Sequence, residues 1–156
     1  MSKSLKRVKA ALAAAGLDID VLEVSDGTRT AADAAAAAGC HIDQIAKSII
    51  FQRVDSEIPV LFLTAGGNRV DGEKAAQVAG VALKRADAAA VRSYTGFAIG
   101  GVSPIGHLNP IDAFWDPRLS EFDVIYGAAG TPRHIFPVSP DDLLRITNAQ
   151  PAEFTS

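Results

Sequence analysis

The spacing of hydrophobic positions near the start of the chain predicts an amphipathic helix. Leu5, Val8 and Leu12 recur at intervals of three and four, which places them on one helical face, so we expect a helix over residues 4–15. Gly16 follows at the position where glycine commonly ends a helix. Much of the remaining surface of this helix is basic, through Lys3, Lys6, Arg7 and Lys9.

A strand and a second helix are predicted next. Residues 19–24 (IDVLEV) have the composition of a strand, and a turn is predicted at residues 25–27. Thr30 precedes the run AADAAAAA, where its hydroxyl is suited to cap a helix that Gly39 ends. Alanine has high helix propensity but little bulk, so this helix is expected to pack closely against a larger element.

Residues 41–66 predict the centre of the fold. The segment HIDQIAKSIIF (41–51) indicates a short helix that runs into a strand beginning near Ser48. After a turn at residues 55–57, the run IPVLFLTAG (58–66) is almost wholly apolar, which is typical of a strand buried on both faces. The two strands are predicted to pair as a central hairpin.

Helices and loops dominate the middle of the chain. Asp71 is expected to cap a helix that ends at Gly80, and another short helix is predicted around residues 86–92. Residues 94–110, YTGFAIGGVSPIGHLNP, carry four glycines and two prolines and are expected to form no regular structure.

The last third of the chain predicts strands followed by one helix. Ser139 and the Pro-Asp-Asp that follows it are a strong helix start, and the final eight residues are expected to be frayed. Interleaved strands and helices predict a mixed α/β class and a single domain over residues 1–156. The expected strands are 111–115, 122–126 (joined to the first by a turn at Asp116-Pro117) and 135–138.

Composition narrows the classes of function. The 156 residues are 48% hydrophobic and 21% charged, which suits an ordinary globular protein. The net charge of −3 gives no support to a protein whose whole surface binds DNA or a membrane. Cys40 is the only cysteine, so no internal disulfide forms. The chain has no apolar run of about 18 residues and no secretory signal, and we expect a cytoplasmic location.

Several familiar sites are absent from the sequence. Ser103 is followed by Pro104 and Ile105, so it does not lie in a nucleophile elbow. Residues 66–69 (GGNR) follow a strand but lack the Gly-Lys-Ser/Thr of a phosphate loop. The three histidines lie far apart in sequence, so the residues indicate neither a metal site nor a cofactor.

A lysine, a glycine-rich loop and a histidine remain as candidates. Lys47 is flanked by apolar residues and either extends to the surface or lies at the rim of a pocket. The loop 100–106 (GGVSPIG) either forms a tight structural turn or offers backbone N–H groups to a ligand. His134 either faces a ligand or leads into a strand. By themselves these residues suggest a pocket for a small ligand, not a particular reaction.

The order of these segments resembles the YbaK/ProX (YbaK/EbsC) family. The resemblance covers roughly residues 5–147 and rests on TAADAAAAAG, QIAKSIIF, TAGGNRVD, GFAIGGVSPIGH and GAAGTPRHIFPVSPDDLLRIT in that order. Members of this family are free-standing relatives of the editing domain inserted in bacterial prolyl-tRNA synthetases. The resemblance implies a barrel-like mixed β-sheet flanked by helices, and hydrolysis of the ester bond in mischarged aminoacyl-tRNA.

The resemblance also implies roles for particular residues. The family's pocket lysine matches Lys47, which would be catalytic together with the loop glycines Gly100 and Gly101. A further set would contact the substrate: Ser103, Pro104, Gly106 and, as a weaker match, His134. Under this hypothesis the loop amides hold the aminoacyl carbonyl or its oxyanion, Lys47 positions the terminal adenosine or its phosphate, and the substrate's 2′-hydroxyl helps to activate water.

The chemistry of the substrate agrees with the candidate residues. An aminoacyl ester is already activated, so its hydrolysis requires a positioned water and support for the oxyanion but no protein nucleophile. A pocket that admits alanine and excludes proline would correct an error that a synthetase cannot avoid, because one methylene is worth only about 1–3 kcal/mol. Alanine on the proline tRNA is the first choice; cysteine, serine or threonine are the alternatives.

The expected partners are the acceptor end of mischarged tRNA and prolyl-tRNA synthetase, which would help to deliver that tRNA. Two basic clusters, on the first helix and at Lys84, Arg85 and Arg92, are candidates for contact with tRNA, although each is equally an ordinary solvated surface. No metal, cofactor, membrane or DNA partner is expected.

Three other interpretations remain open from the sequence. A non-catalytic module would use the same pocket to bind an aminoacyl or nucleotide group without turnover. A different hydrolase would cleave small esters or amides independently of tRNA, because a fold does not fix a substrate. A redox role for Cys40 is a distant third, since the chain has no second cysteine to resolve it.

Overall fold

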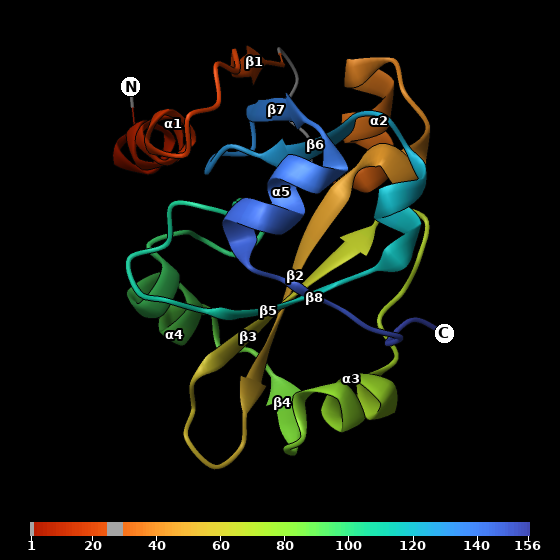
Figure 1. Cartoon of the computed structure of the whole chain (residues 1–156). Helices are drawn as coiled ribbons and strands as arrows, with labels where there is room; N and C mark the ends of the chain where they lie inside the picture. The colour runs from red at the N-terminus through yellow and green to blue at the C-terminus, as the bar shows by residue number, and fades with distance from the viewer. Residues whose placement is uncertain (1, 25–29) are drawn as a thin grey trace.

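The computed structural model describes residues 2–24 and 30–156, so the turn predicted at residues 25–27 lies outside the described residues. Helices and strands alternate along the chain, which confirms the mixed α/β class (Figure 1). The helices are α1 (Lys3–Ala14), α2 (Ala31–Ala38), η1 (Ile42–Gln44), α3 (Gly72–Ala79), α4 (Ala88–Thr95), η2 (Pro117–Glu121) and α5 (Pro140–Thr147). The strands are β1 (Leu22–Glu23), β2 (Ala46–Arg53), β3 (Pro59–Ala65), β4 (Leu83–Arg85), β5 (Asp112–Trp115), β6 (Ile125–Ala128), β7 (His134–Val138) and β8 (Gln150–Pro151).

Capping residues begin and end these helices as the sequence predicts. Thr30 and Asp33 form a reciprocal capping box at the start of α2, and Gly39 ends that helix in the left-handed conformation. The Asp71 carboxylate accepts hydrogen bonds from the first turn of α3, and the Ser139 hydroxyl does the same at α5.

The described strands form two sheets. One has three strands in the order β1-β7-β6, and the other has five in the order β4-β2-β3-β5-β8. An isolated parallel bridge between Ile45 and Tyr126 connects the two sheets just before β2 begins. The described strands therefore bend around a shared interior without closing into a barrel.

The predicted central hairpin is confirmed. β2 pairs antiparallel with β3, and Lys47 lies opposite Thr64 in the register. β2 begins at Ala46, two residues before the predicted start, and Lys47 is its second residue, shortly after η1 ends at Gln44. The ladder with β3 from Ala46 to Gln52 fixes the sheet face to which each of these residues points.

The core lies on both faces of β3, whose seven residues are all buried. Leu61 and Leu63 pack in the larger cluster, with the apolar face of α1, Trp115 and Phe136. Phe62 packs on the other face, against Phe154, with ring centroids 5.0 Å apart. The apolar run in this segment is therefore explained by burial on two sides.

Three predictions differ from the structure. The last eight residues are not frayed, because β8 pairs with β5 and the Phe154 side chain is fully buried. The strand predicted over residues 19–24 is only Leu22–Glu23, where it pairs with β7. The strands predicted at 111–115 and 122–126 belong to different sheets, and η2 connects them instead of a simple turn.

Candidate functional site

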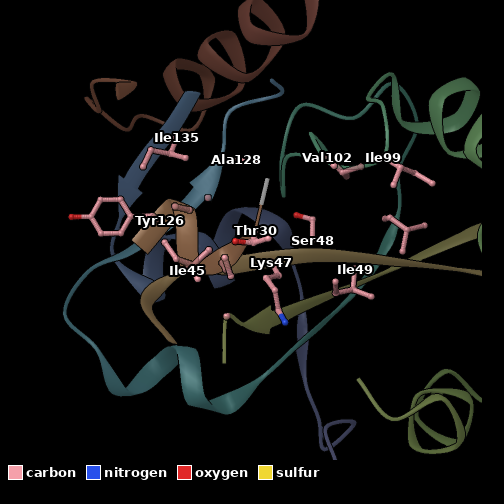
Figure 2. A pocket seen from close by; sticks show the side chains of 18 of the residues that line it. Thr30, Ile45, Lys47, Ser48, Ile49, Ile99, Val102, Tyr126, Ala128 and Ile135 are labelled. Carbon is pink, nitrogen blue, oxygen red and sulfur yellow. The ribbon is translucent and has the colours of Figure 1, made fainter. Parts of the chain in front are cut away.

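A cavity of about 710 Å³ lies among β2, α2, β6 and two loops. Its lining is mainly apolar and includes Ile45, Ile50, Ile99, Val102 and Ile135 (Figure 2). Hydroxyl groups of Thr30, Ser48 and Thr131 interrupt this lining. The volume lies in the range of small-molecule sites, and a mainly apolar lining with a few polar groups is typical of them.

The β2 side of the cavity, which we call the strand wall (residues 46–50), presents two different polar groups. Ser48 points toward Val102 and into the space below the loop, whereas the Lys47 side chain extends to the opposite side of β2 (Figure 2). Successive side chains of a strand point to opposite faces, which accounts for the separation. The Ser48 hydroxyl is buried and has no hydrogen-bond partner among the described residues.

The Lys47 ammonium donates a hydrogen bond of 2.6 Å to the Asn68 carbonyl. Burial lowers the pKa of Lys47, and the nearby Arg69 guanidinium lowers it further, while Asp116 and Asp43 act in the opposite direction. The lysine is one of the residues that line the cavity at its rim, and its ammonium lies near one further cation and two carboxylates.

The turn that receives Lys47 is held by two carboxylates that sequence reasoning missed. Asp43 accepts hydrogen bonds from the Gly67 amide (2.8 Å) and from Arg118 (3.0 Å). Asp116 accepts from the Asn68 side chain at 2.9 Å and from the Ala65 amide at 3.1 Å. Burial alone would raise the pKa of Asp43, but the bonds from Arg118 and Gly67 outweigh it and lower that pKa.

The opposite side of the cavity, which we call the loop wall, consists of residues 96–107 and 128–131. Within it, the Gly101 amide donates to the Ala98 carbonyl at 2.9 Å, which closes a turn. Gly100 has a φ of 94° at the third position of this turn, where a type II turn requires glycine. The Gly101 amide is therefore occupied, whereas the Gly100 and Val102 amides make no hydrogen bond within the described part of the chain.

Three loop residues predicted to contact substrate do not line the cavity. Ser103 is fully buried, and its hydroxyl accepts from the Ile105 amide at 3.3 Å. Pro104 and Gly106 line a second hollow of about 770 Å³, together with His107. The structure thus brings Lys47 and Gly100 to the cavity but places these three residues where they shape the loop.

His134 does not line the cavity, but it contacts Thr131, which does. The Thr131 hydroxyl forms a hydrogen bond of 2.6 Å with His134 Nδ1, whose direction depends on the imidazole tautomer, and accepts another from the Arg133 amide. The other ring nitrogen, Nε2, is 3.9 Å from a Glu23 carboxylate oxygen. Thr131, which lines the cavity, is thus the residue through which His134 reaches it.

The described residues contain no group of three or more His, Cys, Asp or Glu side chains placed to hold a metal ion. Burial raises the pKa of the Cys40 thiol, so the thiolate form that redox and nucleophilic chemistry need is disfavoured. No helix among the described residues has the length and hydrophobicity to cross a membrane.

Comparison with known proteins assigns the class. Residues 25–146 match the sequence profile of the aminoacyl-tRNA editing domain, so the chain belongs to that family. The fold agrees: the chain superposes on the crystal structure of a protein described as a proposed trans-editing enzyme for prolyl tRNA synthetase. The TM-score is 0.93 with 41% sequence identity, over 100% of this chain and 99% of that one.

Two further relatives have no described activity. The crystal structure of the hypothetical protein APE2540 superposes with a TM-score of 0.87 at 27% identity, over 96% of this chain and 99% of that chain. The uncharacterized protein YwhH of Bacillus subtilis (strain 168) is 28% identical over 140 residues, which span 90% of this chain and 88% of YwhH. The editing-domain class predicted from the sequence is therefore confirmed.

Proposed function

We propose that this protein is a trans-editing hydrolase that removes a small amino acid from mischarged tRNA, with alanine on the proline tRNA as its first substrate. The observation that carries the proposal is the cavity of about 710 Å³, in an editing-domain fold, with Lys47 at its rim and Gly100 in its opposite wall. A relative of 41% identity is described as acting for prolyl tRNA synthetase, which supports the choice of tRNA.

The aminoacyl group enters the space between Ser48 and Val102 in this proposal. The unoccupied amides of Gly100 and Val102 support the carbonyl oxygen as negative charge develops on it. Gly101 holds the turn by its bond to Ala98, and the substrate's own 2′-hydroxyl helps a water molecule to attack. The acyl bond to the ribose breaks, and the free amino acid and tRNA leave.

Lys47 binds the acceptor end of the tRNA at the rim. Its ammonium lies near the Arg69 guanidinium, and the Asp43 and Asp116 carboxylates balance these two charges, in a chain whose net charge is −3. A phosphate or ribose oxygen replaces the Asn68 carbonyl as the partner of Lys47. Affinity for tRNA is then modest and falls with salt, and prolyl-tRNA synthetase assists delivery.

In this proposal the cavity selects the acyl group by size. The apolar side chains of Ile45, Ile50 and Val102 surround a small acyl side chain and exclude the proline ring. Cysteine, serine and threonine are the alternative acyl groups. Serine and threonine stay among them because the Ser48 hydroxyl has no hydrogen-bond partner among the described residues and could bind their hydroxyl groups.

A panel of proline tRNAs charged with alanine, cysteine, serine, threonine or proline tests the proposal. We expect rapid release of one small amino acid, no release of proline, and unchanged activity in a chelator. Binding of the acylated tRNA without release would favour a non-catalytic module. Hydrolysis of small esters at a rate that tRNA does not improve would favour a different hydrolase on the same fold.

A further inference from the structure

The two loops of the cavity are attached to a helix that contributes no residue to the cavity lining. α1 packs its apolar face in the core and lies beside both segments of the loop wall. The Ser4 hydroxyl donates to the Gly130 carbonyl at 2.8 Å, next to the cavity residue Thr131. α1 also lies outside residues 25–146, the part of the chain that matches the family.

Arg7 makes the contacts between α1 and the glycine loop. Its Nε donates to the Gly106 carbonyl at 3.1 Å, and its Nη2 donates to the Gly96 carbonyl at 2.8 Å. One guanidinium group thus joins the two ends of the loop that carries Gly100 and Val102. The same group lies over the Phe97 ring, with Cζ 4.8 Å from the ring centroid.

The glycines at the two ends of the loop make this approach possible. A Cβ atom on Gly96 would lie 2.4 Å from Arg7 Nη2, and one on Gly106 would lie 3.3 Å from the Arg7 backbone. Both glycines also have positive φ angles, 83° and 78°, which side chains rarely adopt. The loop therefore leaves room for the guanidinium at Gly96 and for the α1 backbone at Gly106.

We propose that Arg7 is a positioning residue, which holds the glycine loop so that the Gly100 and Val102 amides face the reacting carbonyl. Hydrophobic burial of Phe97 and Val102 attaches the loop but does not direct its amides, because burial is not directional. Two hydrogen bonds from a rigid planar fork fix the separation of the loop ends. Arg7 therefore differs in role from its exposed neighbours Lys6 and Lys9 on the same helix.

The inference deepens the proposed function, because the kinetic effect of Arg7 presupposes deacylation. The test compares Arg7→Met, which keeps the length and apolar stem, with Arg7→Lys, which keeps the charge but not the fork. Lys9→Met is the matched control, since it removes one positive charge from an exposed position of the same helix. Each variant is measured by amide hydrogen exchange and by deacylation kinetics.

We expect Arg7→Met to accelerate exchange of the hydrogen-bonded loop amides, those of Phe97, Gly101 and Ile105, by about tenfold or more, because hydrogen bonds to a charged donor are worth at least that factor in an equilibrium constant. Exchange in β3 should not change, and Lys9→Met should resemble the wild type. In kinetics, Arg7→Met should lower kcat and leave KM nearly unchanged, since the amides act on the transition state. Arg7→Lys should restore little of either property.

Three results would overturn the proposal. Wild-type exchange in the loop of Arg7→Met would show that the guanidinium does not hold it, and equal acceleration in β3 would show a general loss of stability. A rise in KM shared by Arg7→Met and Lys9→Met, with kcat unchanged, would make Arg7 a tRNA contact. Failure of the wild type to hydrolyse any aminoacyl-tRNA would reject the proposed function, while hydrogen exchange would still decide whether Arg7 holds the loop.

Discussion

The two sides of the cavity are built in different ways. The strand wall belongs to a β2–β3 ladder from Ala46 to Gln52 and rests on the fully buried strand β3. Most of the loop wall lies outside any ladder, with Ala128 alone paired to β7, and side-chain hydrogen bonds from Ser4 and Arg7 attach it to α1. Changes in the strand wall should therefore alter binding chemistry with little effect on geometry, whereas changes in the loop wall should alter geometry first.

The largest effect is expected at the strand wall, in Lys47→Met. We expect deacylation to fall about 100-fold, the size of effect that follows misplacement of a substrate. The thermal unfolding temperature should change little, because methionine keeps the apolar stem of Lys47 and burial disfavours the charged form of the lysine. Steady-state kinetics and calorimetry measure the two properties.

Lys74→Met is the matched control for this variant. Lys74 is an exposed residue of α3 whose ammonium donates to the Thr155 carbonyl, away from the residues that line the cavity, so its replacement should leave both activity and stability nearly unchanged. A Lys47→Met enzyme as active as the wild type would remove the lysine from the account.

A smaller loss is expected in the loop wall, in Gly100→Ala. Alanine at a φ of 94° strains the turn and moves the Gly100 and Val102 amides, so kcat/KM should fall about tenfold. Gly80→Ala imposes a similar strain at a φ of 74°, at the end of α3 and away from the cavity. Equal activity losses in the two variants would show that strain alone, and not the loop's position, lowers activity.

Ser48→Ala should have opposite effects on stability and activity. A buried hydroxyl without a partner costs about 1–3 kcal/mol, so its removal should raise the free energy of unfolding. If this hydroxyl binds the aminoacyl group, kcat/KM should fall several-fold, and most strongly for a hydroxyl-bearing amino acid. Denaturant unfolding and the aminoacyl-tRNA panel measure the two effects; a fall in stability would show that the hydroxyl has a structural partner.

The smallest effect is expected from Asp43, through pH. Because the folded-state pKa of Asp43 lies below its usual value, the carboxylate adds stability above the unfolded-state pKa, and this stability is lost as pH falls through the folded-state pKa. Asp43→Asn should therefore be less stable than the wild type at neutral pH and equally stable in acid. A difference between the two proteins that does not change with pH would contradict this assignment.

Local signals predicted much of the fold. Thr30, Asp71 and Ser139 cap the helices that the sequence indicates, because a cap depends on residues within one turn. The central hairpin followed from one apolar run, since a strand buried on two faces leaves a clear pattern. The burial of Phe154 was missed because short terminal strands acquire their order from distant partners.

In the candidate site, too, local features could be predicted and features that depend on distant partners could not. Lys47 was found from its apolar neighbours and from the family resemblance, but the direction of its ammonium depends on Asn68. The role of Arg7 was hidden, because a basic helix face looks the same whether or not one member reaches a carbonyl 89 or 99 residues away. The sequence did not indicate that Asp43 and Asp116 hold the turn beside Lys47, since the groups that they bind there lie on other elements.

The most direct test of the account compares alanine and proline on the same proline tRNA, in wild type and Lys47→Met. The account predicts that the wild type releases alanine rapidly and leaves prolyl-tRNA intact, and that Lys47→Met loses the release of alanine while it remains folded. Equal hydrolysis of both aminoacyl-tRNAs, or full activity in Lys47→Met, would contradict it.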